Sequence, residues 1–257
     1  MADRVYPPVI ALARVLFRVL GLRFTITGAE HIPRSGGAVL VSNHVSYLDF
    51  VLCGLAAQPS RRLVRFMAKE AVFRHRVSGP LMRGMHHIPV DRKAGAQAYA
   101  DAVGALRGGE IVGVFPEATI SQSFTLKSFK LGAARMAIEA QVPLVPMLCW
   151  GGQRILTKSR KRDFSRGRAI VIVVGEPFVP GPDDKAGSVT LELRRRMQDL
   201  LEQAQAIYPD VPEGPEDRWW IPAHLGGTAP TPEEAAARDG ADARGRRGDP
   251  QDPAAAV

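Results

Sequence analysis

A histidine and an aspartate five residues apart follow the first fully apolar strand expected in this chain of 257 residues. His44 comes directly after the strand expected over residues 39–42, and Asp49 lies in the first turn of the helix expected over residues 46–57. Residues five apart on one helix point in different directions, so the pair can meet only if His44 lies in the preceding turn. A histidine oriented by a carboxylate can remove a proton from a hydroxyl near neutral pH. Ser46 and Asp49 also have the spacing of a capping box, which is a purely structural explanation of the aspartate.

Charged and polar residues also follow other apolar segments of the chain. Glu117 and Thr119 come after the strand expected over residues 111–115, and Lys130 starts an expected helix. Lys69 and Arg92 follow two further expected strands. Ligands of open α/β sheets bind beyond the carboxyl ends of the strands, so these residues are candidates for one binding site. Two structural alternatives stay open: Arg92 could pair with a local acid, and Lys130 could lie on the solvent side of its helix.

Four blocks of the sequence resemble, in order and spacing, the glycerolipid acyltransferase family, which includes the 1-acylglycerol-3-phosphate acyltransferases. The family's Asn-His-x4-Asp block is matched by Asn43, His44 and Asp49. Its second block, an arginine after a strand, is matched by Arg92, with Lys69 upstream. Its third block, Phe-Pro-Glu-Gly-Thr-Arg-Ser, is matched in part by residues 115–121, and its fourth, Val-Pro-Ile-Val-Pro-Val, by residues 142–147. The resemblance covers about residues 20–180.

Two residues of the third block depart from the family pattern. Ala118 stands in place of the glycine, which predicts that the turn does not need a positive φ, because alanine there would cost about 1 kcal/mol or more. Ile120 stands in place of the arginine that the family is expected to use for the phosphate of its acceptor. Either other cations hold that phosphate, or the acceptor has a different polar head. The other cations are Lys69, Arg92, Lys127 and Lys130.

The resemblance implies a direct acyl transfer from a thioester to a hydroxyl. His44 would remove the proton from the hydroxyl, and Asp49 would orient the imidazole and stabilise its protonated form. Arg92 and Lys69 would bind the anionic head of the acceptor, with Lys130 as a further cation. Glu117 would bind an acceptor hydroxyl, with Thr119 lining the same turn. The chain has no Gly-x-Ser-x-Gly sequence and no metal-ligand spacing, so we expect neither an acyl-enzyme nor a metal site.

The expected function is the acylation of a lysophospholipid, with 1-acylglycerol 3-phosphate as the preferred acceptor and phosphatidic acid as the product. No cofactor is expected beyond the thioester of coenzyme A or acyl carrier protein as co-substrate. One alternative keeps this chemistry and uses another lysolipid or a glycolipid, as Ile120 allows. A second alternative is a non-catalytic protein of the same fold that binds anionic lipid. The intact set of His44, Asp49 and Glu117 argues against that second alternative.

Composition favours a peripheral membrane enzyme over a nucleic-acid-binding protein. The formal net charge is +8 and 46% of the residues are apolar. Residues 211–257 contain five arginines and nine acids, so they carry a net charge of −4 and leave +12 on residues 1–210. A basic body suits an anionic membrane surface and phosphorylated substrates, and the sequence has no zinc spacing, no aromatic RNA-binding motif and only a weak helix-turn-helix pattern. We expect the protein on the cytoplasmic face of the cell membrane. The two cysteines, Cys53 and Cys149, are expected to be reduced thiols, and Cys53 is expected to be buried on an apolar helix.

The order of the elements predicts one α/β domain with a mixed, largely parallel sheet flanked by helices. Residues 1–22 would form an amphipathic helix that associates with membranes, although it could instead cover the protein's own core. Residues 23–210 would be the acyltransferase domain. Residues 154–168 form a basic loop that is either solvated or in contact with lipid head groups or an anionic acyl carrier. Residues 211–257 would be a polar tail, disordered from residue 228 onward.

Overall fold

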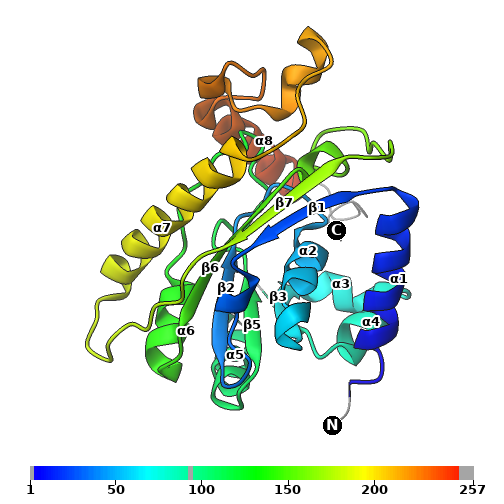
Figure 1. Cartoon of the computed structure of the whole chain (residues 1–257). Helices are drawn as coiled ribbons and strands as arrows, with labels where there is room; N and C mark the ends of the chain where they lie inside the picture. Colours follow the sequence, from blue (N-terminus) through cyan, green and yellow to red (C-terminus); the bar gives the residue numbers. More distant parts are fainter. Residues whose placement is uncertain (1–2, 92–94, 249–257) are drawn as a thin grey trace.

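The apolar runs of the sequence form one mixed sheet. The computed structural model describes residues 3–91 and 95–248, and within these ranges seven strands lie in the order β1-β7-β6-β2-β5-β3-β4 (Figure 1). All neighbouring strands are parallel except β6 and β7, which confirms the prediction of a mixed, largely parallel sheet. The strands are β1 (Arg23–Thr27), β2 (Ala38–Ser42), β3 (Val64–Lys69), β4 (Ile88–Val90), β5 (Ile111–Val114), β6 (Leu144–Trp150) and β7 (Ala169–Val174).

Helices cover both faces of this sheet (Figure 1). One face packs against α5, α6 and α7, and the other packs against α1 and α2. The helices are α1 (Tyr6–Val19), α2 (Asp49–Ala56), α3 (Glu70–Arg74), α4 (Ser78–Gly84), α5 (Gly95–Arg107), α6 (Gly132–Ala140), α7 (Ala186–Ala206) and α8 (Pro232–Gly248).

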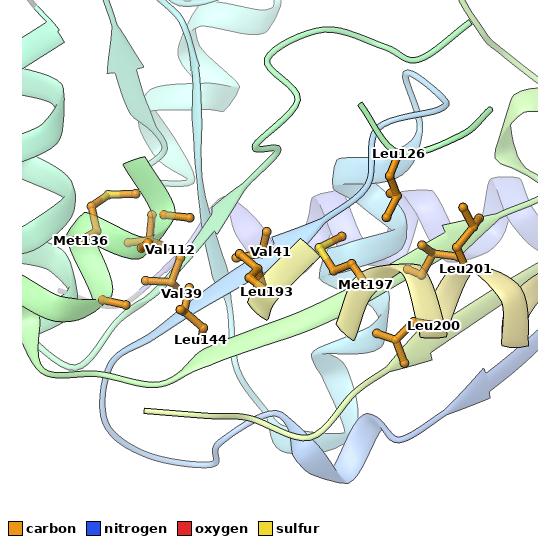
Figure 2. Packing of buried hydrophobic residues seen from close by; sticks show 14 of the residues in the cluster. Val39, Val41, Val112, Leu126, Met136, Leu144, Leu193, Met197, Leu200 and Leu201 are labelled. Atoms are coloured by element: carbon orange, nitrogen blue, oxygen red, sulfur yellow. The ribbon is translucent and has the colours of Figure 1, made fainter. Parts of the chain in front are cut away.

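The central strand β2 is buried on both faces, which explains its unbroken apolar sequence. Successive side chains of a strand point to opposite faces. Val39 and Val41 therefore join the cluster formed with α7, where Leu193 and Met197 lie near them (Figure 2). Ala38 and Leu40 join the second cluster, which contains residues of α1 and α2. This double burial holds the end of β2, and hence the start of the turn that carries His44, in one position.

The helical stretch expected over residues 72–85 is divided into α3 and α4. The chain is extended at His75, and α4 begins at Ser78. Pro80 then lies in the first turn of α4, where the backbone N–H that proline lacks would have no partner within the helix. The proline therefore fits the start of a helix and would not fit the middle of a longer one.

The tail differs from the expectation of disorder beyond residue 228, because residues 232–248 form α8. Thr231 and Glu234 make a capping box at its start. The Glu234 carboxylate accepts the backbone N–H of Thr231 at 3.0 Å, and the Thr231 hydroxyl accepts the N–H of Glu234 at 3.3 Å. Pro232 at the first helical position also favours the helix. Residues 249–257 lie outside the described ranges.

Helix α1 presents apolar side chains both to the protein and to solvent. Tyr6 and Phe17 are buried, and the Tyr6 hydroxyl donates to the Val64 carbonyl at 2.8 Å. On the outer side, Leu12 and Leu16 are 69% and 50% exposed, and Val15 and Val19 are exposed as well. The helix thus covers part of the core and also leaves a second apolar face uncovered. Within the described ranges, no helix is long and apolar enough to span a bilayer.

Both cysteines are buried free thiols; for Cys53, its apolar neighbours predicted this burial. Cys53 lies on α2 and Cys149 on β6. A hydrogen bond with Cys53, together with burial, raises the pKa of the Cys149 thiol well above its usual value. Thiolate is the reactive form of cysteine, so these contacts make Cys149 a poor nucleophile at neutral pH.

Candidate active site

The structure brings His44 and Asp49 into direct contact, as their spacing requires. Helix α2 begins at Asp49, and His44 lies in the turn after β2. The distance from His44 Nδ1 to Asp49 Oδ2 is 3.0 Å. The same Oδ2 accepts the backbone N–H groups of Val45 and Ser46, each at 2.8 Å. Asp49 therefore orients His44 and holds the turn that precedes α2. The expected capping box forms only in part, because the Ser46 hydroxyl accepts the N–H of Leu48 and no side chain caps the first turn of the helix.

These contacts fix which nitrogen of His44 can act as a base. Oδ2 can only accept, so Nδ1 carries the hydrogen and the neutral ring keeps its lone pair on Nε2. The ring stacks on Phe115 at a centroid distance of 4.4 Å, and the side chain is 21% exposed. Complete burial raises the pKa of Asp49, while the hydrogen bonds from His44, Ser46 and Val45 oppose this shift. The His44 side chain is thus partly exposed, while its orienting group is completely buried.

Glu117 joins two turns of the site. Its Oε1 accepts the backbone N–H of His44 and its Oε2 accepts the backbone N–H of Lys127, both at 3.0 Å. The side chain is buried, and this burial raises the pKa of the carboxyl to about 7, against the two hydrogen bonds, which lower it. The sequence pointed to a glutamate that binds a substrate hydroxyl, whereas the structure shows one whose two oxygens contact the protein backbone.

The turn that carries Glu117 contradicts one expectation. Ala118 has a φ of +63°, so the turn does adopt the left-handed conformation that glycine favours. The geometry is held by neighbouring backbone bonds: Ala118 N–H donates to the Phe115 carbonyl at 3.1 Å, and Ser121 N–H donates to the His44 carbonyl at 2.7 Å. The chain therefore retains the turn without the glycine. Ile120 is only 4% exposed, so its side chain packs inside the protein.

The remaining predicted binding residues differ in their exposure and in their contacts with this turn. Thr119 is exposed, and its hydroxyl accepts a hydrogen bond from Lys127 Nζ at 2.6 Å. Lys130 is exposed just before α6. Lys69 ends β3 beside Val90, at the same carboxyl edge of the sheet as His44. Arg92 lies outside the described residues, so the structure gives it no position.

The basic loop after β6, which the sequence suggested is either solvated or in contact with lipid head groups or an acyl carrier, is bound to the His44 turn. The Thr157 hydroxyl donates to the Val45 carbonyl at 2.7 Å, and the Ser46 hydroxyl donates to the Leu156 carbonyl at 2.7 Å. Lys158 follows directly and forms an ion pair with Asp239 of α8. These contacts join residues more than 75 positions apart, and only the opposite charges of loop and tail hinted at them.

The basic loop is partly neutralised by the acidic residues that follow α7. Arg154 is almost completely buried and pairs with Asp210 and Asp217 at 3.0 Å each. Its guanidinium also lies over the Trp220 ring, 4.4 Å from the centroid. Much of the positive charge in this loop therefore stabilises the packing of the C-terminal segment.

His87 has a structural role at the edge of the sheet. Its Nδ1 accepts the backbone N–H of Phe66 at 3.0 Å, and burial lowers its pKa to about 4. The ring is therefore neutral near pH 7. Across residues 3–91 and 95–248, no group of three His, Cys, Asp or Glu side chains is placed to hold a metal ion.

Comparison with known proteins agrees with this arrangement. A model of the acyltransferase family matches residues 23–150. The chain is 29% identical to a 1-acyl-sn-glycerol-3-phosphate acyltransferase of Bacillus subtilis, over 73% of this chain and 94% of that protein. It is 33% identical to the human 1-acyl-sn-glycerol-3-phosphate acyltransferase alpha, over 64% of this chain and 59% of the human protein. The chain thus spans less than two thirds of the human relative.

A solved structure shares the fold. The crystal structure of the 1-acyl-sn-glycerophosphate acyltransferase PlsC from Thermotoga maritima superimposes with a TM-score of 0.68. It covers 79% of this chain and 81% of its own, at 23% identity. The histidine–aspartate turn at the carboxyl edge of the sheet, the family model and the relatives lead to one conclusion: the chain belongs to the acyltransferase family.

Proposed function

We propose that this protein transfers a fatty acyl group from a thioester to the free hydroxyl of 1-acylglycerol 3-phosphate, giving phosphatidic acid. The observation that carries the proposal is the His44–Asp49 contact of 3.0 Å, which leaves His44 Nε2 as a base at the carboxyl edge of the sheet. The names of the relatives from Bacillus subtilis and Homo sapiens support the choice of acceptor.

The reaction needs one proton carrier and no covalent enzyme intermediate. His44 Nε2 takes the proton of the acceptor hydroxyl as the oxygen attacks the thioester carbonyl carbon. Asp49 stabilises the imidazolium that forms. When the carbonyl re-forms, the C–S bond breaks, and the imidazolium returns its proton to the leaving thiolate. The products are the new ester and the free thiol of coenzyme A or acyl carrier protein.

The same proposal places the protein on the surface of a membrane, because both substrates carry acyl chains. The outer face of α1 supports this placement, with four exposed apolar side chains and two exposed arginines. The arginines, Arg14 and Arg18, suit anionic lipid. The cytoplasmic face of the cell membrane is the side on which the thioester donors would be available.

The test is an acyl-transfer assay with labelled acyl-CoA and separate acceptors: 1-acylglycerol 3-phosphate, lysophosphatidylcholine, 1-acylglycerol and a glycolipid. We expect labelled phosphatidic acid as the main product. His44→Ala should lower kcat/KM by a factor of about 10² to 10⁴, which is the usual contribution of a general base. His224→Ala is the matched control, because His224 is exposed on a turn near the C-terminus.

Each outcome of this assay has a clear meaning. Activity of His44→Ala within threefold of the wild type would contradict the assignment of the base. Transfer to a glycolipid or to lysophosphatidylcholine in preference to 1-acylglycerol 3-phosphate would favour the second candidate function, for which the buried Ile120 is the specific observation. Transfer to none of the acceptors would favour a lipid-binding protein without catalysis.

A further inference from the structure

Two lysine side chains from distant parts of the chain converge on the Asp239 carboxylate, and Lys158 Nζ also lies 2.7 Å from Asp242 Oδ2. Lys127 Nζ lies 2.6 Å from Asp239 Oδ2, and Lys158 Nζ lies 2.6 Å from Asp239 Oδ1. Lys127 comes from the segment after β5, Lys158 from the loop after β6, and Asp239 from α8. The lysine side chains are 28% and 15% exposed, so the pair is partly shielded from water. Two ammonium groups of the protein body are thus paired with a carboxylate of its own helix α8.

The two chain segments that carry these lysines are hydrogen-bonded to the turn that holds His44. The Lys127 backbone N–H donates to Glu117, and the other oxygen of that carboxylate accepts the N–H of His44. On the second side, Lys158 follows Thr157, whose hydroxyl donates to the Val45 carbonyl. Each lysine is therefore fixed, through one intermediate contact, to the turn that holds His44. An anion bound between them would lie close to a hydroxyl that reaches the base.

The base and the groups that bind the phosphate must lie close together, because the hydroxyl and the phosphate of the acceptor are on adjacent carbons of one glycerol unit. The position where the family carries an arginine cannot supply the charge, since Ile120 is apolar and buried. The Lys127 ammonium also contacts the Thr119 hydroxyl, which adds a polar group to the same site. Lysine ammonium groups bind phosphate as point charges.

Resting on the function proposed above, we propose that Lys127 and Lys158 bind the phosphate of the acceptor, and that the Asp239 carboxylate occupies their site until the acceptor displaces it. A phosphate monoester can displace a carboxylate because it carries about −1.5 to −2 charges near pH 7 and three acceptor oxygens. Helix α8 can yield because little apolar surface holds it: among its described side chains, only Ala235 is buried.

Binding of inorganic phosphate, measured by titration calorimetry, tests the site without any turnover. Lys158→Gln should weaken binding at least tenfold, because a charge-assisted contact is lost. Asp239→Asn should tighten binding severalfold, because the carboxylate shared by both lysines is removed. Adding Asp242→Asn, which removes the second carboxylate from Lys158, should tighten it further. Lys161→Gln is the control, since it removes the same charge from an exposed position of the same loop and should bind phosphate as the wild type does. Lys127→Gln serves as a second variant if Lys158→Gln does not fold.

Three binding results would overturn the proposal. One is equal weakening by Lys161→Gln and Lys158→Gln, which would show general charge attraction. Another is an unchanged or lower affinity in Asp239→Asn, which would make Asp239 a structural partner of the lysines. The third is the absence of measurable phosphate binding by Asp239→Asn.

Kinetics then separate this inference from the proposed function. Lys158→Gln should raise the KM for 1-acylglycerol 3-phosphate at least tenfold, with the KM for the acyl donor and for phosphate-free 1-acylglycerol unchanged. Suppose that the wild type acylates 1-acylglycerol 3-phosphate and that Lys158→Gln has the same KM for this acceptor. The inference would then be wrong, and the proposed function would still hold. Wild-type protein that binds phosphate through Lys158 but does not acylate this acceptor would overturn the function and leave the site standing.

Discussion

The Glu117 carboxyl group lies between two backbone turns and away from water. Burial raises its pKa from 4.5 to about 7. Between these two pH values the folded protein therefore holds a proton that the unfolded chain has already released. The free energy of unfolding must then decrease as the pH rises through this window.

A comparison of the wild type with Glu117→Gln isolates this effect, because glutamine does not titrate. We expect the wild type to lose about 3 kcal/mol relative to the variant between pH 4.5 and pH 7, at 1.36 kcal/mol per unit of pKa shift. Urea unfolding of both proteins at several pH values measures the difference. A difference that stays constant with pH would show that Glu117 is ionised throughout, through its bonds to the amides of His44 and Lys127.

At the scale of single residues, the sequence predicts contacts between residues that are close along the chain and misses contacts between residues that are far apart. The spacing of His44 and Asp49 already required the turn-to-helix geometry that the structure shows. The sequence marked Lys158 only as part of the basic loop over residues 154–168, because its position beside the His44 turn depends on how the loop after β6 returns to that turn. Glu117 was found, but its contacts with two backbone amides are set by tertiary packing and leave no pattern in the sequence.

The turn over residues 115–121 shows how an element can keep its shape after losing its favoured residue. A left-handed conformation costs a residue other than glycine about 1 to 2 kcal/mol, and Ala118 adopts it. The hydrogen bonds of the turn and its packing on β5 evidently outweigh this cost. The sequence suggested that this cost in free energy would exclude a positive φ at Ala118. The cost is small compared with the combined stabilisation from the hydrogen bonds and packing of the turn.

Ala118→Gly should therefore stabilise the protein. Relief of the strained conformation gains about 1 to 2 kcal/mol, and the added freedom of glycine in the unfolded chain removes about 0.4 to 1 kcal/mol of this. A net gain of about 1 kcal/mol in the free energy of unfolding is expected from urea titration. Ala100→Gly, at an exposed position of α5, should instead destabilise by about 0.5 to 1 kcal/mol. Equal losses in both variants would argue against strain at Ala118.

The elements themselves were predictable wherever burial determines their sequence. The strands β2 and β7 are buried along their whole length and have unbroken apolar sequences, so their positions could be read directly. Helix α8 has a polar composition that suggested disorder. It is ordered because it forms ion pairs with the rest of the domain, and composition does not reveal such pairs. The capping box of Thr231 and Glu234 and the proline at the first helical position were its local signals, and composition outweighed them.

For the whole molecule, the uncovered apolar face of α1 is the feature that points beyond the chain. The double substitution Leu12→Gln and Leu16→Gln should lower binding to vesicles that contain anionic lipid by about tenfold, because two side chains lose apolar contact with the bilayer. Folding should be nearly unaffected, since both residues are exposed. Sedimentation with vesicles gives the bound fraction.

Leu191→Gln is the control for this prediction, because Leu191 is 72% exposed on α7, which packs on the other face of the sheet. If the double variant of α1 bound vesicles as tightly as this control, α1 would serve only the core of the protein. The test uses substitutions in place of a truncation, because removing residues 1–22 would also take away the buried Tyr6 and Phe17.

Because Cys53 and Cys149 are buried, the native protein should react very little with thiol reagents. A single cysteine introduced at residue 12 or 16 would consequently be the main labelled position, with no need to remove the natural thiols from the core. A nitroxide attached there would report its immersion depth through collisions with oxygen, which concentrates in the bilayer, and with a water-soluble paramagnetic complex. The two inert thiols thus open a spectroscopic route to the orientation of this protein on a lipid surface.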